Sequence, residues 1–413
     1  MPASSRIPWM IPFLLFLAAV AGCGGGDSRD SEGPPDAVDP DLQARLRALP
    51  YAGSTRVAPS DSGGVASIDR ARTAPGLTFY VVQQLCLAEL VDLDGRVVHR
   101  WSDPEDGSWR RAELLPGGDL LVIGTGKPVR PESGGRGYVA DESRFLRRLD
   151  REGRSLWQRG LNAHHDVEVT PDGSLLLLGF RRRLAPDIDP EVPVRDDLIL
   201  RLSPDGELLD EISLLDLARA AADAFPLDAA RADSKGGAAW LDLFHVNSLE
   251  QMARPGLFGT HALYDPRHVL ICLRHQDRIA IVDTEARRIV WSWGRWELRG
   301  PHDAQLLPDG NILIFDNGVG RRESRVVEMD PRRDEIVWSW RPRPPLDLYT
   351  LSKGSAQRLS NGNTLVAESD KGRILEVTSE GDLVWEFLTP HETGRGRRAA
   401  IVRARRVPAD VLD

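Results

Sequence analysis

Three histidines stand at the same place relative to a recurring turn motif. His165 lies six residues before Pro171, His302 lies six residues before Pro308, and the segment HVNSLEQ aligns His245 with both. An imidazole ring can act as a nucleophile, as a general acid or base, or as a metal ligand. If the fold brings these positions together, the spacing predicts a polar site built on imidazoles.

Arg274 is expected beside these histidines. It ends the apolar run HVLICLR, which follows the segment that carries His245. Neighbouring strands of such a unit are predicted to be antiparallel, so the end of one lies at the same face as the start of the other. Arginine offers a planar, permanently charged group that suits anionic oxygens. His164, next to His165, is expected to point the other way and to have a structural role.

The elements that would position these side chains are β-strands in a repeat of roughly fifty residues. Each copy contains a tight turn rich in Pro, Asp, Asn and Gly, followed by an apolar run. These turns are LPGG at 115–118, TPDG at 170–173, LPDG at 307–310 and LSNG at 359–362. A second marker is a tryptophan near the end of the unit, seen as Trp101, Trp157, Trp291, Trp338 and Trp385.

Six copies of a four-stranded unit predict an all-β, six-bladed β-propeller over residues 64–413. A β-helix has a much shorter repeat and a β-sandwich has none, so the period favours the propeller. Equivalent positions of a propeller converge on its axis. His165, His245 and His302 are therefore predicted to meet at one mouth of the central channel, and two other copies carry Arg110 and Gly354 at that position.

Three long breaks interrupt the repeat, at residues 126–142, 181–196 and 214–239. The last contains LLDLARAAADAF, whose apolar spacing and alanine content predict a short helix. We expect these insertions to decorate one rim of the propeller and to shape access to the channel.

The N-terminus has the pattern of an export signal. Residues 1–22 combine one basic residue, an apolar stretch and small residues, and they precede Cys23. This resembles a bacterial lipoprotein signal, after which Cys23 would be lipidated; an ordinary secretory signal is the alternative. Residues 23–63 are predicted to be a short disordered tether. The protein is thus expected to be an exported, periplasmic or cell-surface lipoprotein held to a membrane by its lipid.

Composition narrows the class of protein further. The chain has 413 residues, 62 acidic and 53 basic groups and a net charge of -9, which provides no basic field for a nucleic-acid partner. After the N-terminus no apolar run reaches the ~18 residues of a membrane helix. Cys86 and Cys272 either form a disulfide or are separate small buried residues, and the sequence favours the second reading.

Four segments together carry a family resemblance: FHVNSLE, LICLRHQDRIAIVDTEARRIVWSWG, GPHDAQLLPDGNILIFDNG and GSAQRLSNGNTLVAES. The chain resembles the bacterial arylsulfotransferases, six-bladed propellers that move a sulfuryl group between phenols without a nucleotide sulfate donor. The resemblance extends from about residue 64 to the C-terminus. It implies a small aromatic sulfate donor, a phenolic acceptor, and neither a cofactor nor a metal.

The resemblance also implies roles for individual residues. His302 matches the family's transiently sulfated histidine. The other matching positions are His165, His245 and Arg274 in the active site, and Asn247 and Ser355 as substrate contacts. Either His165 or His245 would supply the proton for the departing phenolate, and Asp303 is a candidate acceptor for the second nitrogen of His302. The long N-terminal domain of larger members has no counterpart, so oligomeric state and exact substrate are not implied.

Two other functions remain open from the residues alone. Three converging histidines could instead bind zinc or another transition metal and activate water. The propeller could also be a non-catalytic surface protein that presents a binding face, because repeat folds serve many functions.

Overall fold

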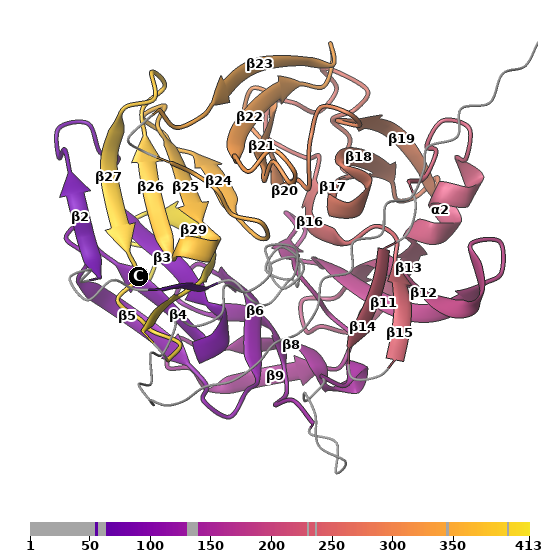
Figure 1. The fold of residues 1–413 in the computed structure, drawn as a ribbon, viewed down its shortest axis with the longest axis horizontal. Helices are drawn as coiled ribbons and strands as arrows, with labels where there is room; N and C mark the ends of the chain where they lie inside the picture. Colours follow the sequence, from indigo (N-terminus) through magenta and orange to yellow (C-terminus); the bar gives the residue numbers. More distant parts are fainter. Residues whose placement is uncertain are drawn as a thin grey trace, which may run out of the picture. The chain divides into compact units, whose positions relative to one another are not determined.

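Six antiparallel sheets, each built on four strands, follow one another around a central channel (Figure 1). The computed structural model describes residues 54–56, 63–129, 139–228, 231–235, 238–343, 347–394 and 396–413. The prediction of an all-β, six-bladed β-propeller is confirmed. The predicted signal at residues 1–22, Cys23 and nearly all of the tether lie outside the described residues. Within the described part, no helix is long and apolar enough to cross a membrane.

The blades are numbered here in chain order, and their strands are given from the channel outward. Blade 1 contains β29 (Ile401–Val407), β3 (Leu77–Val82), β4 (Leu87–Val91) and β5 (Val97–Ser102), and blade 2 contains β6 (Ser108–Leu114), β7 (Leu120–Thr125), β8 (Arg144–Leu149) and β9 (Ser155–Arg159). Blade 3 contains β10 (Val167–Val169), β11 (Leu175–Ala185), β12 (Asp189–Leu202) and β13 (Leu208–Ser213), and blade 4 contains β16 (Val246–Gln251), β17 (His268–Leu273), β18 (Arg278–Asp283) and β19 (Arg288–Trp293). Blade 5 contains β20 (His302–Leu306), β21 (Ile312–Asp316), β22 (Arg325–Asp330) and β23 (Glu335–Trp340), and blade 6 contains β24 (Ser355–Arg358), β25 (Thr364–Glu368), β26 (Arg373–Val377) and β27 (Leu383–Leu388).

Both ends of the propeller sequence close the ring. The C-terminal strand β29 pairs antiparallel with β3 and is the innermost strand of blade 1. The N-terminal strand β2 (Gly64–Ile68) pairs with β27 as a fifth, outermost strand of blade 6. In Figure 1 the yellow strand β29 accordingly lies beside the indigo strand β3. The C-terminal strand therefore lines the channel, a placement that the repeat did not predict.

The turn motif joins the first and second strands of a blade. In blade 5 the Leu307 N–H donates to Asn311 O at 2.8 Å and the Gly310 N–H donates to Leu307 O at 3.0 Å. Gly310 has φ +93°, and a Cβ there would lie 2.5 Å from the hydroxyl oxygen of Tyr264. The phenol contact is specific to Gly310, but the positive φ recurs at Gly118 (+94°), Gly173 (+80°) and Gly362 (+88°), which explains the recurring Gly of the motif.

The tryptophan marker links blades 4, 5 and 6 to the blade that follows, whereas the indole nitrogens of Trp101 and Trp157 bond to no described group. Three indole N–H groups on outer strands donate to the outer turn of the following blade: Trp291 to Asp334 Oδ1 (2.9 Å), Trp338 to Ser379 O (3.2 Å) and Trp385 to Leu93 O (3.1 Å). The marker recurs with the period of the fold because the same inter-blade contact is made repeatedly.

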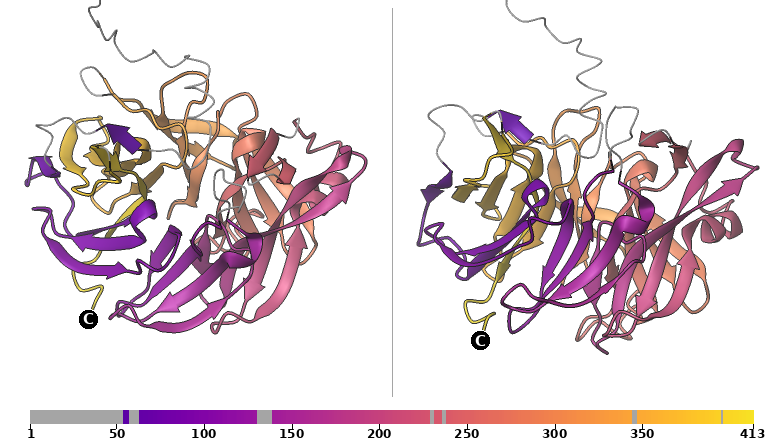
Figure 2. Two further views of the ribbon diagram at one scale, coloured as in Figure 1. Left: turned by 60° about the horizontal axis from the view of Figure 1, so that its bottom comes forward. Right: turned by 90° about the horizontal axis from the view of Figure 1, so that it is seen from below.

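Blade 3 carries the largest additions. Residues 181–196, predicted as a break, instead belong to a long hairpin in which β11 and β12 extend together on either side of a turn at 186–188, seen from the side in Figure 2. The predicted helix is present as α2 (Leu214–Ala220), with the Ser213 side chain accepting the Asp216 N–H at 3.1 Å as an N-cap. It is followed by β14 (Arg231–Lys235) and β15 (Ala238–Asp242), and β15 pairs parallel with β12.

The remaining elements are short. They are the pair β1 (Ser54–Arg56) and β28 (Arg397–Ala399), and the 3-10 helices η1 (Gln83–Leu85), η2 (Asp141–Ser143), η3 (Arg274–Gln276) and η4 (Ser369–Lys371). Cys86 and Cys272 are free and buried in different hydrophobic clusters, so the reading of two separate buried thiols is confirmed.

Candidate active site

The predicted convergence of the three histidines is observed. The starts of the inner strands line a pocket of about 620 Å³, open mouth included, to which all six blades contribute. Its wall contains His165 from blade 3, His245 from blade 4 and His302 from blade 5. The ring centroids of His165 and His245 are 4.9 Å apart.

An unusual backbone aims these side chains at the axis. His165 and His245 have φ +57° and +48°, in the left-handed region that non-glycine residues rarely adopt. Asp303, next to His302, has φ +54°. The pairing of β16 and β20 with their neighbours is interrupted by a bulge at the same end. Bulges and local strain of this kind re-aim side chains and are common beside active sites.

His302 is held in one tautomer. Its Nδ1–H donates to Asn317 Oδ1 at 2.6 Å and to Gly300 O at 3.0 Å. The amide of Asn317 is oriented because its Nδ2 donates to the carbonyls of Thr350 and Lys353. The suggestion that Asp303 plays this part is therefore wrong. Because Nδ1 carries the hydrogen, the lone pair is on Nε2, where it accepts the backbone N–H of Lys353 at 3.2 Å.

Electrostatics keep His302 neutral. Burial, together with the positive charges of Arg274 and Lys353, lowers the pKa of His302 to about 3. Arg274 lies directly after β17, where its backbone N–H contacts His245 O and its guanidinium donates to Leu351 O at 3.2 Å. The same arginine also acts on His245, so the prediction that it lies beside the histidines is supported.

His245 is backed by a carboxylate. Its Nδ1–H donates to Asp242 Oδ2 at 2.6 Å, and its backbone N–H donates to Asp242 Oδ1 at 2.9 Å. Burial lowers the pKa of His245 well below its usual value, although Asp242 opposes this effect. Asp242 is the last residue of β15, so the insertion between blades 3 and 4 supplies the partner of a pocket histidine.

His165 is backed by another imidazole. Nδ1 of His165 lies 2.8 Å from Nδ1 of His164, and His164 Nε2 lies 3.0 Å from Gly179 O. A carbonyl only accepts, so His164 carries its hydrogen on Nε2 and accepts the Nδ1–H of His165. His164 is buried and structural, as expected. When they are neutral, His165, His245 and His302 thus all carry their hydrogen on Nδ1 and have a lone pair on Nε2.

The other predicted contacts are placed differently. Asn247 lines the pocket, with Nδ2 donating to Pro301 O at 2.8 Å and a buried Oδ1 that bonds to no described group. Ser355 lies next to the pocket wall, which is formed there by Ser352, Lys353 and Gly354. The Ser355 hydroxyl accepts the Ala404 N–H at 3.3 Å.

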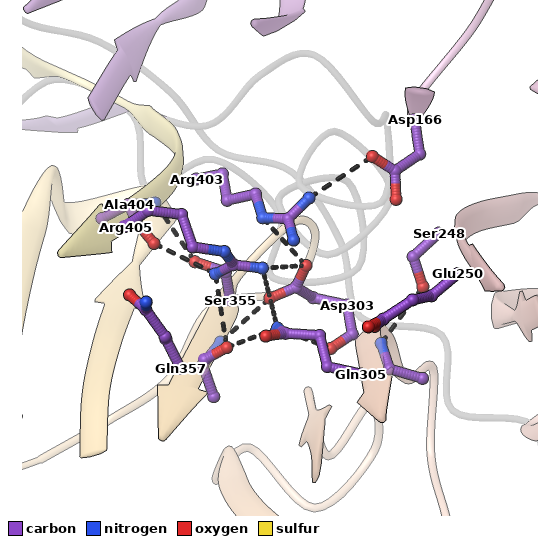
Figure 3. A network of polar contacts seen from close by, with 12 residues as sticks. Asp166, Ser248, Glu250, Asp303, Gln305, Ser355, Gln357, Arg403, Ala404 and Arg405 are labelled. Atoms are coloured by element: carbon purple, nitrogen blue, oxygen red, sulfur yellow. Dashed lines mark hydrogen bonds and ion pairs between the residues drawn. The ribbon is translucent and has the colours of Figure 1, made fainter. Parts of the chain in front are cut away.

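The residues that follow His165 and His302 in the chain, Asp166 and Asp303, belong to a layer of ion pairs (Figure 3). Arg403, on β29, extends between Asp166 and Asp303, with nitrogen to oxygen distances of 3.3 and 3.1 Å. Arg405 also contacts Asp303 at 2.9 Å, and Arg111 contacts Asp166 at 3.0 Å. These contacts join blades 1, 2, 3 and 5 across the channel and form the floor of the pocket.

One group among the described residues brings metal-ligand types together: Asp242, His245 and His275. Both rings already donate a hydrogen from Nδ1, His245 to the Asp242 carboxylate and His275 to the Asp242 carbonyl at 3.0 Å. We assign it as a hydrogen-bonded cluster. It includes one of the three histidines that were considered as a common metal-ligand set.

Several residues of the site were not predicted from the sequence. Asn317 and Gln83 directly follow the second strands of blades 5 and 1, as Arg274 does in blade 4, so the same rule could have found them. Lys353 lies beside Gly354, which the repeat had aligned. Asp242 and Arg403 had no such signal, because they come from an insertion and from the closing strand.

A family model and several solved structures match the chain. A family model described as Arylsulfotransferase (ASST) matches residues 111–390. No curated protein matches the chain. One similar solved structure is a protein of unknown function from Bacteroides caccae, with 13% identity, a TM-score of 0.49, and 80% of this chain and 98% of that chain covered. A second is apo AztD from Citrobacter koseri, with 13% identity, a TM-score of 0.41, and 80% of this chain and 97% of that chain covered. A third is a catalytically inactive virginiamycin B lyase from Staphylococcus aureus with quinupristin, with 11% identity, a TM-score of 0.42, and 81% of this chain and 87% of that chain covered.

Proposed function

The chain belongs to the arylsulfotransferase family, and on that premise we propose that it transfers a sulfuryl group from an aryl sulfate ester to a phenol through a sulfohistidine on His302. The aryl sulfate ester is itself the donor in this proposal, so no nucleotide sulfate takes part. The observation that carries the proposal is the tautomer of His302. A neutral ring whose Nδ1–H is held by Asn317 has its nucleophilic lone pair on Nε2, on the pocket wall.

The cations of the site suit the transferred group. Sulfuryl transfer resembles phosphoryl transfer, with a loose transition state whose charge is spread over three nonbridging oxygens. Arg274 acts electrostatically on both His302 and His245, and Lys353 donates its backbone N–H toward Nε2 of His302. We assign these two residues to the nonbridging oxygens, because preorganised donors stabilise charge without reorganising during the reaction.

We assign the proton transfer to His245. Two buried imidazoles whose centroids are 4.9 Å apart repel each other when both are charged, which favours a single positive charge on the pair. A carboxylate behind His245 stabilises an imidazolium, whereas His165 is backed by the neutral ring of His164. Binding of the anionic ester further favours protonation of His245.

The reaction then balances in two halves. His302 Nε2 attacks sulfur, the bond from sulfur to the phenolic oxygen breaks, and that oxygen takes the proton from His245 Nε2. An incoming phenol next attacks the sulfohistidine, loses its proton to His245 and leaves His302 neutral. This sequence predicts ping-pong kinetics.

The decisive experiment is to trap the intermediate. The protein is mixed with 4-methylumbelliferyl sulfate without acceptor, digested at alkaline pH and analysed by mass spectrometry. The peptide containing His302 is expected to gain one sulfuryl group and to lose it after phenol is added, and the matched His302→Gln variant is expected to gain nothing. Turnover without any labelled peptide, or a label on another residue, would overturn the assignment.

We further propose that the protein is an exported lipoprotein anchored through Cys23. The support is the signal pattern of residues 1–22. Mature protein from cells is expected in the membrane fraction with a diacylated N-terminal peptide, and the Cys23→Ser variant is expected to lose both properties. An unmodified wild-type N-terminus would reject the anchor.

A further inference from the structure

The supports behind His165 and His245 both end at a buried aspartate. His245 Nδ1 reaches Asp242 directly. Behind His165, the Nε2 atom of His164 lies 3.2 Å from Asp197 Oδ1. Asp197 and Asp242 are 0% and 1% exposed, so neither carboxylate is compensated by bulk water.

Arg195 lies between these two carboxylates. One terminal nitrogen of its guanidinium is 2.8 Å from Asp197 Oδ1, and the other is 3.5 Å from Asp242 Oδ2. The guanidinium also stacks over the ring of Phe180 at 4.8 Å. The parallel pairing of β12 with β15 places Arg195 in register with Asp242. The arginine is therefore held between the two supports by backbone pairing as well as by its side chain.

Asp197, Asp242 and Arg195 form a charged unit whose net charge is negative. Two aspartates and one arginine sum to minus one, which a single imidazolium neutralises. The other charged or titratable groups near the two histidines have separate positions: Arg110 on the pocket wall, Arg274 and His275 on η3, and Asp166 in the floor with Arg111 and Arg403. The net charge of the unit is thus balanced when His165 and His245 together carry one positive charge.

We propose that Arg195 is a positioning residue that limits the two pocket histidines to a single positive charge, that is, to one proton beyond their neutral forms. This inference rests on the proposed function, because that proton is the one exchanged with the phenolic oxygen. Without Arg195, two buried carboxylates attract a second proton onto the imidazoles. A protonated His165 would then face His245 and make it a weaker base toward the incoming phenol.

The electrostatics of the individual groups agree with this role. Burial and the neighbouring histidines are the main causes that hold the pKa of His165 well below its usual value, and the charge of Arg195 adds to them. After burial, Arg195 is also the next contributor that lowers the pKa of His164, to about 4. Although burial opposes it, His245 and Arg195 keep the pKa of Asp242 well below its usual range.

The test is the pH dependence of kcat for transfer from 4-nitrophenyl sulfate to phenol. For Arg195→Gln, the acid limb of the plot of kcat against pH is expected to move to higher pH by about one unit. At alkaline pH, kcat should approach that of the wild type. Arg195→Lys keeps the charge and is expected to keep the limb. The double variant Arg195→Gln/Asp197→Asn removes one charge of each sign and is expected to return the limb toward the wild-type position.

A matched control comes from the same hairpin. Arg183 lies 3.3 Å from Asp196 and also pairs with Asp216, away from both histidine supports. Arg183→Gln is expected to leave the pH profile unchanged. If Arg195→Gln does not fold, Asp197→Asn tests the balance in the opposite direction, since it should move the limb to lower pH.

A second readout does not depend on turnover. Protein with isotope-labelled histidine is titrated by NMR, and Arg195→Gln is expected to show at least one additional imidazole that titrates between about pH 5 and 8. If the wild type transfers no sulfuryl group, the proposed function fails while this titration still tests Arg195. An unchanged set of titrating histidines, or an unshifted acid limb in folded Arg195→Gln, would overturn the inference.

Discussion

Two adjacent layers of the channel contain neighbouring residues of the chain but differ in chemistry. His165 and His302 belong to the upper layer. Their neutral rings donate from Nδ1 to His164 and Asn317 and have a lone pair on Nε2. Asp166 and Asp303, the next residues, belong to the lower layer and bind arginines from other blades. A shift of one residue along the strand start thus separates neutral imidazoles from carboxylates held in ion pairs, and Nε2 of His302 accepts only the backbone N–H of Lys353.

The difference indicates how the propeller combines reactivity with stability. An unpaired charge buried in the channel would be costly, so the carboxylates and guanidiniums of the lower layer satisfy one another. Neutral imidazoles avoid that cost and stay reactive. We expect substitutions in the upper layer to change rates, and substitutions in the lower layer to change the free energy of unfolding.

The largest effect is expected for His302→Ala. Removal of the nucleophile eliminates the covalent route, so transfer from 4-methylumbelliferyl sulfate to phenol should fall by at least about 10³-fold. The thermal unfolding midpoint should stay close to that of the wild type, which separates loss of chemistry from loss of fold. Retention of most of the activity would show that the upper layer is not the reacting layer.

Asp242→Asn should have the next largest effect. An amide cannot stabilise the His245 imidazolium, and kcat is expected to fall by about 10²-fold with phenols that are poor leaving groups. The loss should shrink for 4-nitrophenyl sulfate, whose leaving group needs little help from a proton. Equal losses across a series of leaving groups would argue against acid catalysis at this histidine.

Arg403→Met tests the lower layer. It leaves Asp166 and Asp303 without one of their cations and should lower the free energy of unfolding by about 3 kcal/mol, measured by urea denaturation. The change in kcat should remain below about 10-fold. As a control, Arg154 pairs with Asp150 at the surface, and Arg154→Met should cost less than about 1 kcal/mol. A large fall in kcat with an unchanged stability would contradict the division between the layers.

The smallest expected effect is a pH dependence of stability. Burial lowers the pKa of His164 to about 4, whereas an unfolded histidine titrates near its usual value of 6.5. As the pH falls from 6.5 toward 4, the unfolded chain takes up a proton that the folded protein does not, so stability is lost. His164→Gln should reduce this slope by on the order of 1 kcal/mol per pH unit. Denaturation curves at several pH values would measure it, and an identical slope would mean that His164 is not buried as a neutral ring.

The repeat made much of this architecture predictable. The turn and tryptophan markers recur because the same hairpin and the same inter-blade hydrogen bond recur, so the number of blades and the convergence of His165, His245 and His302 followed from spacing. Arg274 followed from the antiparallel order of strands. The long hairpin of blade 3 was less predictable, because residues 181–196 contain charged and turn-forming residues although they pair as strands.

The sequence by itself determined the blade count and the register that brings three imidazoles to one mouth, because rotational symmetry converts a period in the chain into a place in space. Only the tertiary structure decided which groups hold those rings. These groups come from four different places: Asn317 from a strand end, Asp242 from an insertion, Arg195 from an extended hairpin and Arg403 from the closing C-terminal strand. Hydrogen bonds and ion pairs depend on distances of about 3 Å, which a repeat pattern does not specify.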